Sequence, residues 1–225
     1  MIILLNNQKT FNLLLIFFAY FLLINYNLVM LKIILATNNE HKVQEFNEML
    51  NEKVNVISLK EANISIDPEE NGKTYSENAF IKANAAAELT DLPVMSDDSG
   101  IEIESLGEHF PGINSHRYAV ENGGHEKLNQ ILASSSPYAK AKFTCHIVLL
   151  NLNCKGERLD FEGIMEGRIN DKVEGIHGFG YDPIFVPKGY EHSVATLPPE
   201  EKNIISHRYN ACRKLLNYLE ENGKL

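Results

Sequence analysis

The chain has 225 residues, a net charge of −9 at pH 7, 44% hydrophobic residues and 23% charged residues. This length and composition allow a sizeable core and exclude an intrinsically disordered protein. The acidic balance excludes a duplex nucleic-acid surface, because such surfaces depend on many lysine and arginine contacts to phosphate. The cysteines, Cys145, Cys154 and Cys212, are odd in number and lack CxxC spacing, so we expect neither a disulfide framework nor a cysteine-based zinc site. We therefore expect a cytoplasmic protein.

The N-terminal segment, residues 1–29, is strongly apolar, with a run of 14 residues from Phe11 to Ile24 that carries no charge. A bilayer span needs about 20 such residues. Lys9 alone precedes the run with a positive charge, and no small-residue cleavage site follows it, as a signal peptide requires. We interpret residues 1–29 as an extension from a misassigned start, with a signal or anchor as the alternative. We interpret residues 30–225 as one domain and do not expect it to contact a membrane.

The first part of this domain predicts alternating strands and helices. A continuous apolar run at residues 33–36 is typical of a strand covered on both faces. Apolar residues then recur at helical spacing, at Val43, Phe46, Met49 and Leu50. We expect a second strand at residues 54–57, a loop at 60–73 and an alanine-rich helix at 74–90. Strand, turn and helix in this order indicate an α/β fold.

An apolar stretch at residues 93–96 runs into Asp97, Asp98, Ser99 and Gly100. Burying an unpaired carboxylate is costly, so two of them beside a buried strand must be solvated, paired with cations or bound to a metal. The same residue types also form ordinary solvated turns. We predict that the strand ends here, at a site or at a turn, and that a second strand begins at residue 101.

The second part of the domain predicts mainly strands and loops. In chain order we expect a short helix at about 126–133, a hairpin of strands at 143–152 and 158–169, a glycine-rich loop at 175–183, a short strand at 184–186, and an amphipathic helix over 205–219.

The turn at residues 37–42, between the first strand and the first helix, is a candidate phosphate site. Free N–H groups at a helix start bind phosphate, and Lys42 would add a positive charge. Asn38 or Asn39 can take the left-handed conformation that a tight turn often needs. The alternative is a plain N-cap by Thr37 or Asn39 with a solvated lysine, and the sequence does not decide between them.

The acidic loop before the alanine-rich helix is a candidate metal site. A hard divalent cation prefers carboxylate oxygens, which Glu69 or Glu70 together with Asp97 or Asp98 would supply. A solvated acidic loop is the alternative. Lys82, in the middle of the helix, is either a phosphate contact or an ordinary surface lysine.

Polar groups near the C-terminus are candidates for binding a base or a phosphate. Arg208 offers a rigid donor fork and His207 a tunable donor, and Lys202 lies just before them. The alternative is that Arg208 pairs with an acid and His207 caps the helix. Phe179, flanked by glycines, suits stacking on a flat base or, alternatively, plugging the core.

Five motifs occur in order between about residues 31 and 219. They are Thr37-Asn38-Asn39 with Lys42, Glu77-Asn78-Ala79, Ser96-Asp97-Asp98-Ser99-Gly100, Phe179-Gly180-Tyr181-Asp182-Pro183, and Lys202 with Ser206-His207-Arg208. Together they closely resemble the inosine triphosphate pyrophosphatase family. The resemblance implies an elongated α/β fold with a mixed sheet, two lobes and an active-site cleft between them. It also implies a homodimer and the Mg²⁺-dependent hydrolysis of ITP, dITP and XTP to the monophosphate and pyrophosphate, which cleanses the nucleotide pool.

The resemblance further implies a role for individual residues. Asp98 would be the catalytic proton acceptor and, with Glu69, a Mg²⁺ ligand. The substrate-binding residues would be Thr37, Asn38, Asn39, Glu40, His41, Lys42, Lys82, Ser99, Phe179, Gly180, Tyr181, Asp182, Lys202, His207 and Arg208. Asn38 departs from the glycine that many relatives have, which would stiffen the phosphate turn.

Two other functions remain open. One is a related pyrophosphatase for modified pyrimidine nucleotides, which the complete motifs at Phe179 and His207 argue against. The other is a non-catalytic nucleotide-binding protein. The presence of both Asp97 and Asp98 argues against it, because a mere binder gains little from negative charge beside a triphosphate.

Overall fold

The computed structural model describes residues 30–50 and 52–225. The N-terminal extension predicted at residues 1–29 lies outside the described residues. None of the helices within the described ranges is long and apolar enough to cross a bilayer.

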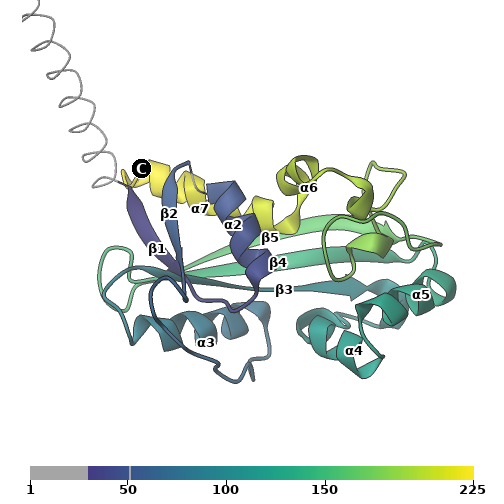
Figure 1. Ribbon diagram of the computed structural model, residues 1–225, viewed down its shortest axis with the longest axis horizontal. Helices are drawn as coiled ribbons and strands as arrows, with labels where there is room; N and C mark the ends of the chain where they lie inside the picture. The colour runs from purple at the N-terminus through teal and green to yellow at the C-terminus, as the bar shows by residue number, and fades with distance from the viewer. Residues whose placement is uncertain (1–29, 51) are drawn as a thin grey trace, which may run out of the picture.

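One mixed sheet of six strands, in the order β2-β1-β3-β4-β5-β6, forms the centre of the described fold (Figure 1). β1 is parallel to β2 and β3, whereas β3, β4, β5 and β6 pair antiparallel. The strands are β1 (Leu31–Leu35), β2 (Val54–Ser58), β3 (Val94–Ile103), β4 (Lys140–Leu150), β5 (Arg158–Ile169) and β6 (Phe185–Pro187). The apolar run of the first strand is explained by burial on both faces of the sheet, since Ile33 and Leu35 belong to one core cluster and Ile34 to another.

Helices cover both faces of the sheet. Figure 1 shows α2, α6 and α7 on one side and α3, α4 and α5 on the other. The helices are α2 (Glu40–Leu50), α3 (Tyr75–Ala87), α4 (Ser115–Glu121), α5 (His125–Ser135), α6 (Pro199–Ile205) and α7 (His207–Glu221), with short 3₁₀ turns at Glu104–Leu106, Gly112–Asn114, Asp182–Ile184 and Val194–Thr196. The fold is therefore a mixed α/β fold, as the sequence predicts.

The buried side chains divide between two ends of the sheet, which gives the fold two lobes. In the first lobe, Phe46 and Leu215 pack on one face, while Ala83 and its neighbours on α3 pack on the other. In the second lobe, Phe143 and Leu128 belong to a separate cluster. The small alanine side chains allow α3 to approach the sheet closely.

A short pairing between β1 and β3 opens the space between the lobes. Only Ile34 with Val94 and Leu35 with Met95 are in register across these two strands. The edge of β3 that faces β1 therefore has no strand partner within the described residues from Ser96 to Ile101, before Glu102 forms a bridge with Pro111. The side chains that follow Ser96 are consequently free to line a cleft.

The structure corrects two expectations. β3 does not end at Asp97, because all ten of its residues, Val94–Ile103, pair with β4. Gly100 is needed for packing and not for a turn, since a Cβ there would lie 2.2 Å from the carbonyl oxygen of Gly112. The helix predicted over 205–219 is confirmed as α7, which begins at His207 and is capped by Ser206, whereas the preceding helix α6 was not predicted.

Candidate active site

A cleft of about 640 Å³ lies between the lobes. All of the predicted site residues line it except Glu40 and His41. His41 instead stacks on Phe179, with ring centroids 5.3 Å apart and an interplanar angle of 16°. The fold therefore gathers segments that are far apart in the sequence around one cavity.

The turn at residues 37–42 is an N-cap built on Asn39. Its side-chain oxygen accepts the N–H groups of His41 at 3.0 Å and Lys42 at 3.3 Å. Asn38 donates instead to the carbonyl oxygen of Ile66 at 3.0 Å. Neither asparagine has a positive φ, so the expected left-handed turn is wrong. Capping by Asn39 is confirmed, but Lys42 is not solvated.

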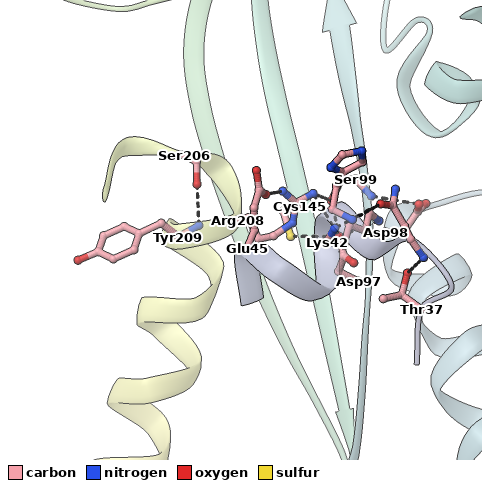
Figure 2. Close-up of polar contacts among 12 residues, drawn as sticks. Thr37, Lys42, Glu45, Asp97, Asp98, Ser99, Cys145, Ser206, Arg208 and Tyr209 are labelled. Carbon is pink, nitrogen blue, oxygen red and sulfur yellow. Dashed lines mark hydrogen bonds and ion pairs between the residues drawn. The ribbon is translucent and has the colours of Figure 1, made fainter. Parts of the chain in front are cut away.

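Asp97 is a buried anchor for the cationic side of the site (Figure 2). Its carboxylate lies 3.0 Å from Lys42 Nζ, 3.8 Å from an Arg208 nitrogen and 2.5 Å from the Ser99 hydroxyl that donates to it. Burial alone would raise the pKa of Asp97, but Lys42 and Arg208 outweigh it and hold the pKa well below its usual range. Asp97 is therefore ionised and holds these two cations in place.

Asp98 faces the other side of β3 and has a different environment. Asn78 donates to it at 3.2 Å, and Lys82 Nζ lies 3.8 Å away. Burial raises the pKa of Asp98, and the attraction of Lys82 and Lys42 does not cancel this effect. A carboxylate with a raised pKa at the edge of a cleft is suited to accepting a proton.

Glu45, on α2, pairs with two cations that line the cleft. It accepts a hydrogen bond from Lys202 at 2.8 Å. It also binds Arg208, as Figure 2 shows. Lys202 pairs in addition with Asp182 at 2.7 Å. Burial opposes the ionised form of Glu45, yet Arg208 and Lys202 lower its pKa. This network holds the donors of Arg208 and Lys202 toward the cleft although both residues are buried.

The glycine-rich loop carries Phe179 to the cleft. The carboxylate of Asp182 accepts the N–H of Phe179 at 2.8 Å, and the hydroxyl of Tyr181 donates to the carbonyl oxygen of Ser115 at 2.7 Å. Gly178 has φ of 75°, and a Cβ there would lie 2.1 Å from an oxygen of Asp182. Glycine at this position therefore leaves room for the Asp182 carboxylate to bind the loop. The ammonium nitrogen of Lys202 lies 5.1 Å from the centroid of the Phe179 ring.

The sequence interpretation did not identify Glu45, Asn78 or Phe143 as site residues. Glu45 lies three residues after Lys42 on the same helix face, which was the available signal. Asn78 belongs to a quoted motif but had no assigned partner. Phe143 lies in an apolar strand, and nothing in its neighbours separates it from other core residues.

Two carboxylates of the cleft fit a magnesium ion. The described residues contain no group of three or more histidine, cysteine or acidic side chains that could hold a metal by itself. Mg²⁺ is usually bound by one or two carboxylates together with substrate phosphates, so this does not argue against a site. Glu70 is paired with Lys82 at 2.9 Å, whereas Glu69 lines the cleft with Asp98 and makes no ion pair among the described residues. Glu69 and Asp98 therefore retain oxygens for a cation.

Comparison with known proteins identifies close relatives. A sequence model of the Ham1 family matches residues 33–218. A dITP/XTP pyrophosphatase of Clostridium perfringens is 42% identical over 203 residues, covering 85% of this chain and 98% of the relative. That of Bacillus subtilis is 38% identical over 200 residues, covering 86% and 99%. Among solved structures, a HAM1 protein from Coxiella burnetii matches with a TM-score of 0.74 and 38% identity, covering 85% of this chain and all (100%) of that one. The Staphylococcus aureus Ham1 protein matches with a TM-score of 0.71 and 37% identity, covering 85% and 99%.

Proposed function

Because this chain belongs to the Ham1 family, we propose that it is a nucleoside triphosphate pyrophosphatase for non-canonical purine nucleotides. It hydrolyses ITP, dITP and XTP to the nucleoside monophosphate and pyrophosphate and so cleanses the nucleotide pool. Relatives that match 84–86% of the chain are dITP/XTP pyrophosphatases. The observation that carries the proposal is one cleft that is lined together by an aromatic ring, the donors of His207 and Arg208, several lysines and Asp98.

At the base end, Phe179 stacks on the purine while His207 and Arg208 donate to its edge. Hypoxanthine and xanthine carry an oxygen acceptor on C6, where adenine carries an amino donor. An adenine would therefore leave these donors unpaired. A site built on hydrogen bonds can reject such a mismatch by a factor of about 10⁴.

At the phosphate end, the residues of the turn at 37–42 and Lys82 bind the triphosphate. Lys42 pairs with Asp97 and is only 14% exposed, so its ammonium group is already oriented when the substrate arrives. Pre-orientation of this kind reduces the entropy that is lost on binding. Ser99 and Lys202 complete the contacts along the nucleotide.

Water attacks the α-phosphorus directly, and Asp98 accepts its proton. The raised pKa of Asp98 suits this role. No covalent phosphoenzyme is needed, since Ser99 is a poor nucleophile here. Its hydroxyl donates to Asp97, and Lys42 and Arg208 hold the pKa of Asp97 well below its usual range, so this carboxylate is a weak base. When bound to Glu69 and Asp98, Mg²⁺ would lower the pKa of the water and neutralise charge that develops on the phosphates.

We further propose that the enzyme acts as a homodimer in the cytoplasm and does not bind nucleic acid. The net charge of −9 supports the absence of nucleic-acid binding, and the free thiols of Cys145, Cys154 and Cys212 support a cytoplasmic location. The homodimer is proposed from the family resemblance alone. Residues 30–225 form the pyrophosphatase domain, and residues 1–29 take no part in the reaction.

Hydrolysis of ITP in ¹⁸O-labelled water tests the reaction. We expect the label in the monophosphate and intact, unlabelled pyrophosphate, because the attacked atom is the α-phosphorus. Turnover of dTTP and ATP under the same conditions, with and without Mg²⁺, measures the selectivity and the cation requirement. Label in pyrophosphate, release of single phosphates, or a preference for dTTP would contradict the proposal.

A further inference from the structure

The imidazole of His207 lies flat on the ring of Phe143, which is on β4. The ring centroids are 4.8 Å apart and the interplanar angle is 12°. Both residues line the cleft. Phe143 is 7% exposed and rests in turn on the fully buried Phe185, at a centroid distance of 4.7 Å. Phe143 therefore cannot move aside, and it fixes the plane of the His207 ring.

The backbone of His207 is fixed independently, through Gly163 on β5. A Cβ on Gly163 would lie 2.1 Å from the carbonyl oxygen of His207 and 2.3 Å from the backbone nitrogen of Ala211. The first turn of α7 therefore sits directly on the sheet. Gly163 therefore fixes the backbone position of His207, while Phe143 fixes the orientation of its ring.

The surroundings of His207 favour a neutral ring with one particular tautomer. Burial lowers its pKa well below the usual range, and the positive charges of Arg208, Lys202 and Lys42 add to this effect while Asp97 opposes it. Nδ1 is buried and has no hydrogen-bond partner among the described residues. A proton on Nδ1 would be buried and unpaired, so the proton belongs on Nε2. Nε2 is not among the buried unpartnered atoms, so it keeps contact with the cleft.

We propose that Phe143 is a positioning residue for purine selection: by holding the plane of the His207 ring, it aims the Nε2–H at the oxygen on C6 of the base. The inference rests on the proposed function and deepens it, because it assigns part of the selectivity to a residue that makes no hydrogen bond. A hydrogen bond weakens steeply as its angle closes, and the terminal torsion of histidine is broad unless its neighbours restrict it. A flat aromatic neighbour supplies that restriction, and an aliphatic one does not.

Phe143→Leu tests the proposal, with Phe161→Leu as the matched control. Phe161 is a phenylalanine of equal burial on the adjacent strand, 8% exposed, and it packs against Tyr218 away from the cleft. For Phe143→Leu we expect the ITP-to-ATP ratio of kcat/KM to fall by about twofold to tenfold, which is the free energy of one aromatic stack expressed as a rate ratio. The lower kcat/KM should come from a higher KM for ITP, with kcat nearly unchanged, because Asp98 and Lys82 are not altered.

Phe143→Tyr keeps the stack and should restore the ratio, whereas Phe161→Leu should lose thermal stability without changing it. Phe143→Met replaces the leucine variant if the latter does not fold. An unchanged ratio in the aliphatic variants, or an equal fall in Phe161→Leu, would overturn the proposal. If wild-type protein does not hydrolyse ITP, the proposed function fails instead.

¹⁵N NMR of the histidine rings gives a readout that does not depend on turnover. In the wild type, His207 should be the neutral Nε2–H tautomer throughout the neutral pH range. In Phe143→Leu, water reaches the ring, so its pKa should rise toward the usual value of about 6.5 and both tautomers should be populated. A protonated or mixed-tautomer His207 in the wild type at neutral pH would contradict the inference.

Discussion

Asp97→Asn and Asp98→Asn should have opposite effects on stability although the two residues are neighbours in sequence. Asp97 is buried between Lys42 at 3.0 Å and Arg208 at 3.8 Å, so its loss removes the ion-pair partner of Lys42 and leaves Arg208 paired with Glu45 alone. Asp98 is instead a carboxylate whose ionised form is disfavoured by burial. Asparagine at position 98 removes the cost of burying a negative charge and keeps the shape of the side chain.

The expected magnitudes differ enough to be separated in one experiment. Removing one partner of a buried ion pair costs about 3–5 kcal/mol. For a domain of this size each kcal/mol lowers Tm by about 2–4 °C, so Asp97→Asn should melt roughly 6–20 °C below the wild type. Asp98→Asn should stay within about 1 kcal/mol of the wild type or exceed it, while losing about 10²–10⁴ in kcat as its general base is removed.

The pH dependence provides a second check, by calorimetry without Mg²⁺ or nucleotide. The folded-state pKa of Asp97 is depressed, so its contribution is present above its unfolded value of about 3.9 and is lost as pH falls below that. The folded-state pKa of Asp98 is raised, so the advantage of Asp98→Asn over wild type should be largest at neutral pH and vanish as pH falls through that pKa. If Asp97→Asn melted with the wild type, or Asp98→Asn lost as much stability as Asp97→Asn, the division of roles would be refuted.

Glu69→Gln should raise the Mg²⁺ concentration needed for half-maximal turnover. Glu70→Gln removes the ion pair with Lys82, so it should change KM for ITP more than the Mg²⁺ requirement. The reverse pattern in a Mg²⁺ titration would assign the cation to Glu70. Arg208→Lys keeps a positive charge beside Glu45 but loses the planar donor fork of arginine. We therefore expect a lower ITP-to-ATP ratio of kcat/KM and an unchanged Mg²⁺ titration. An unchanged ratio would mean that Arg208 does not contact the base. Protein expressed from Met30 should fold and hydrolyse ITP like the full chain, since the family match begins at residue 33; loss of soluble protein or activity would instead favour an anchor or targeting role for the segment before it.

The elements that the sequence predicted well are those whose pattern has one cause. The apolar run of β1 reflects burial on both faces, and the spacing of Val43, Phe46 and Leu50 reflects one buried face of α2. The helix α4 was missed because it is short and has only two buried residues, Ser115 and Ala119, which give no periodic signal. The helix α6 was missed for the same reason, because Lys202 is its one buried residue.

The site residues that the sequence predicted line the cleft, except Glu40 and His41, and those it missed contact them and hold them in place. Glu45 could be recognised only once Lys202 and Arg208 were known to lie beside it, since no local pattern links α2 to α7. The stack of Phe143 on His207 likewise joins β4 to the first residue of α7. Such contacts depend on the register of distant elements, which local propensity and periodicity do not contain.

The most informative error concerns residues 97–100. A turn there would leave both carboxylates in water, where neither could have a strongly perturbed pKa. Because β3 continues, alternation along the strand sends Asp97 to the side of α2 and α7, where Lys42 and Arg208 neutralise it, and Asp98 to the side of α3, where Asn78 and Lys82 lie. One regular strand thus gives two adjacent acids different environments, one as a fixed counter-ion and the other as the proposed proton acceptor. A one-residue shift of β3 against β4 would exchange these two environments, so the full pairing of Val94–Ile103 with β4 is itself a requirement of the proposed reaction.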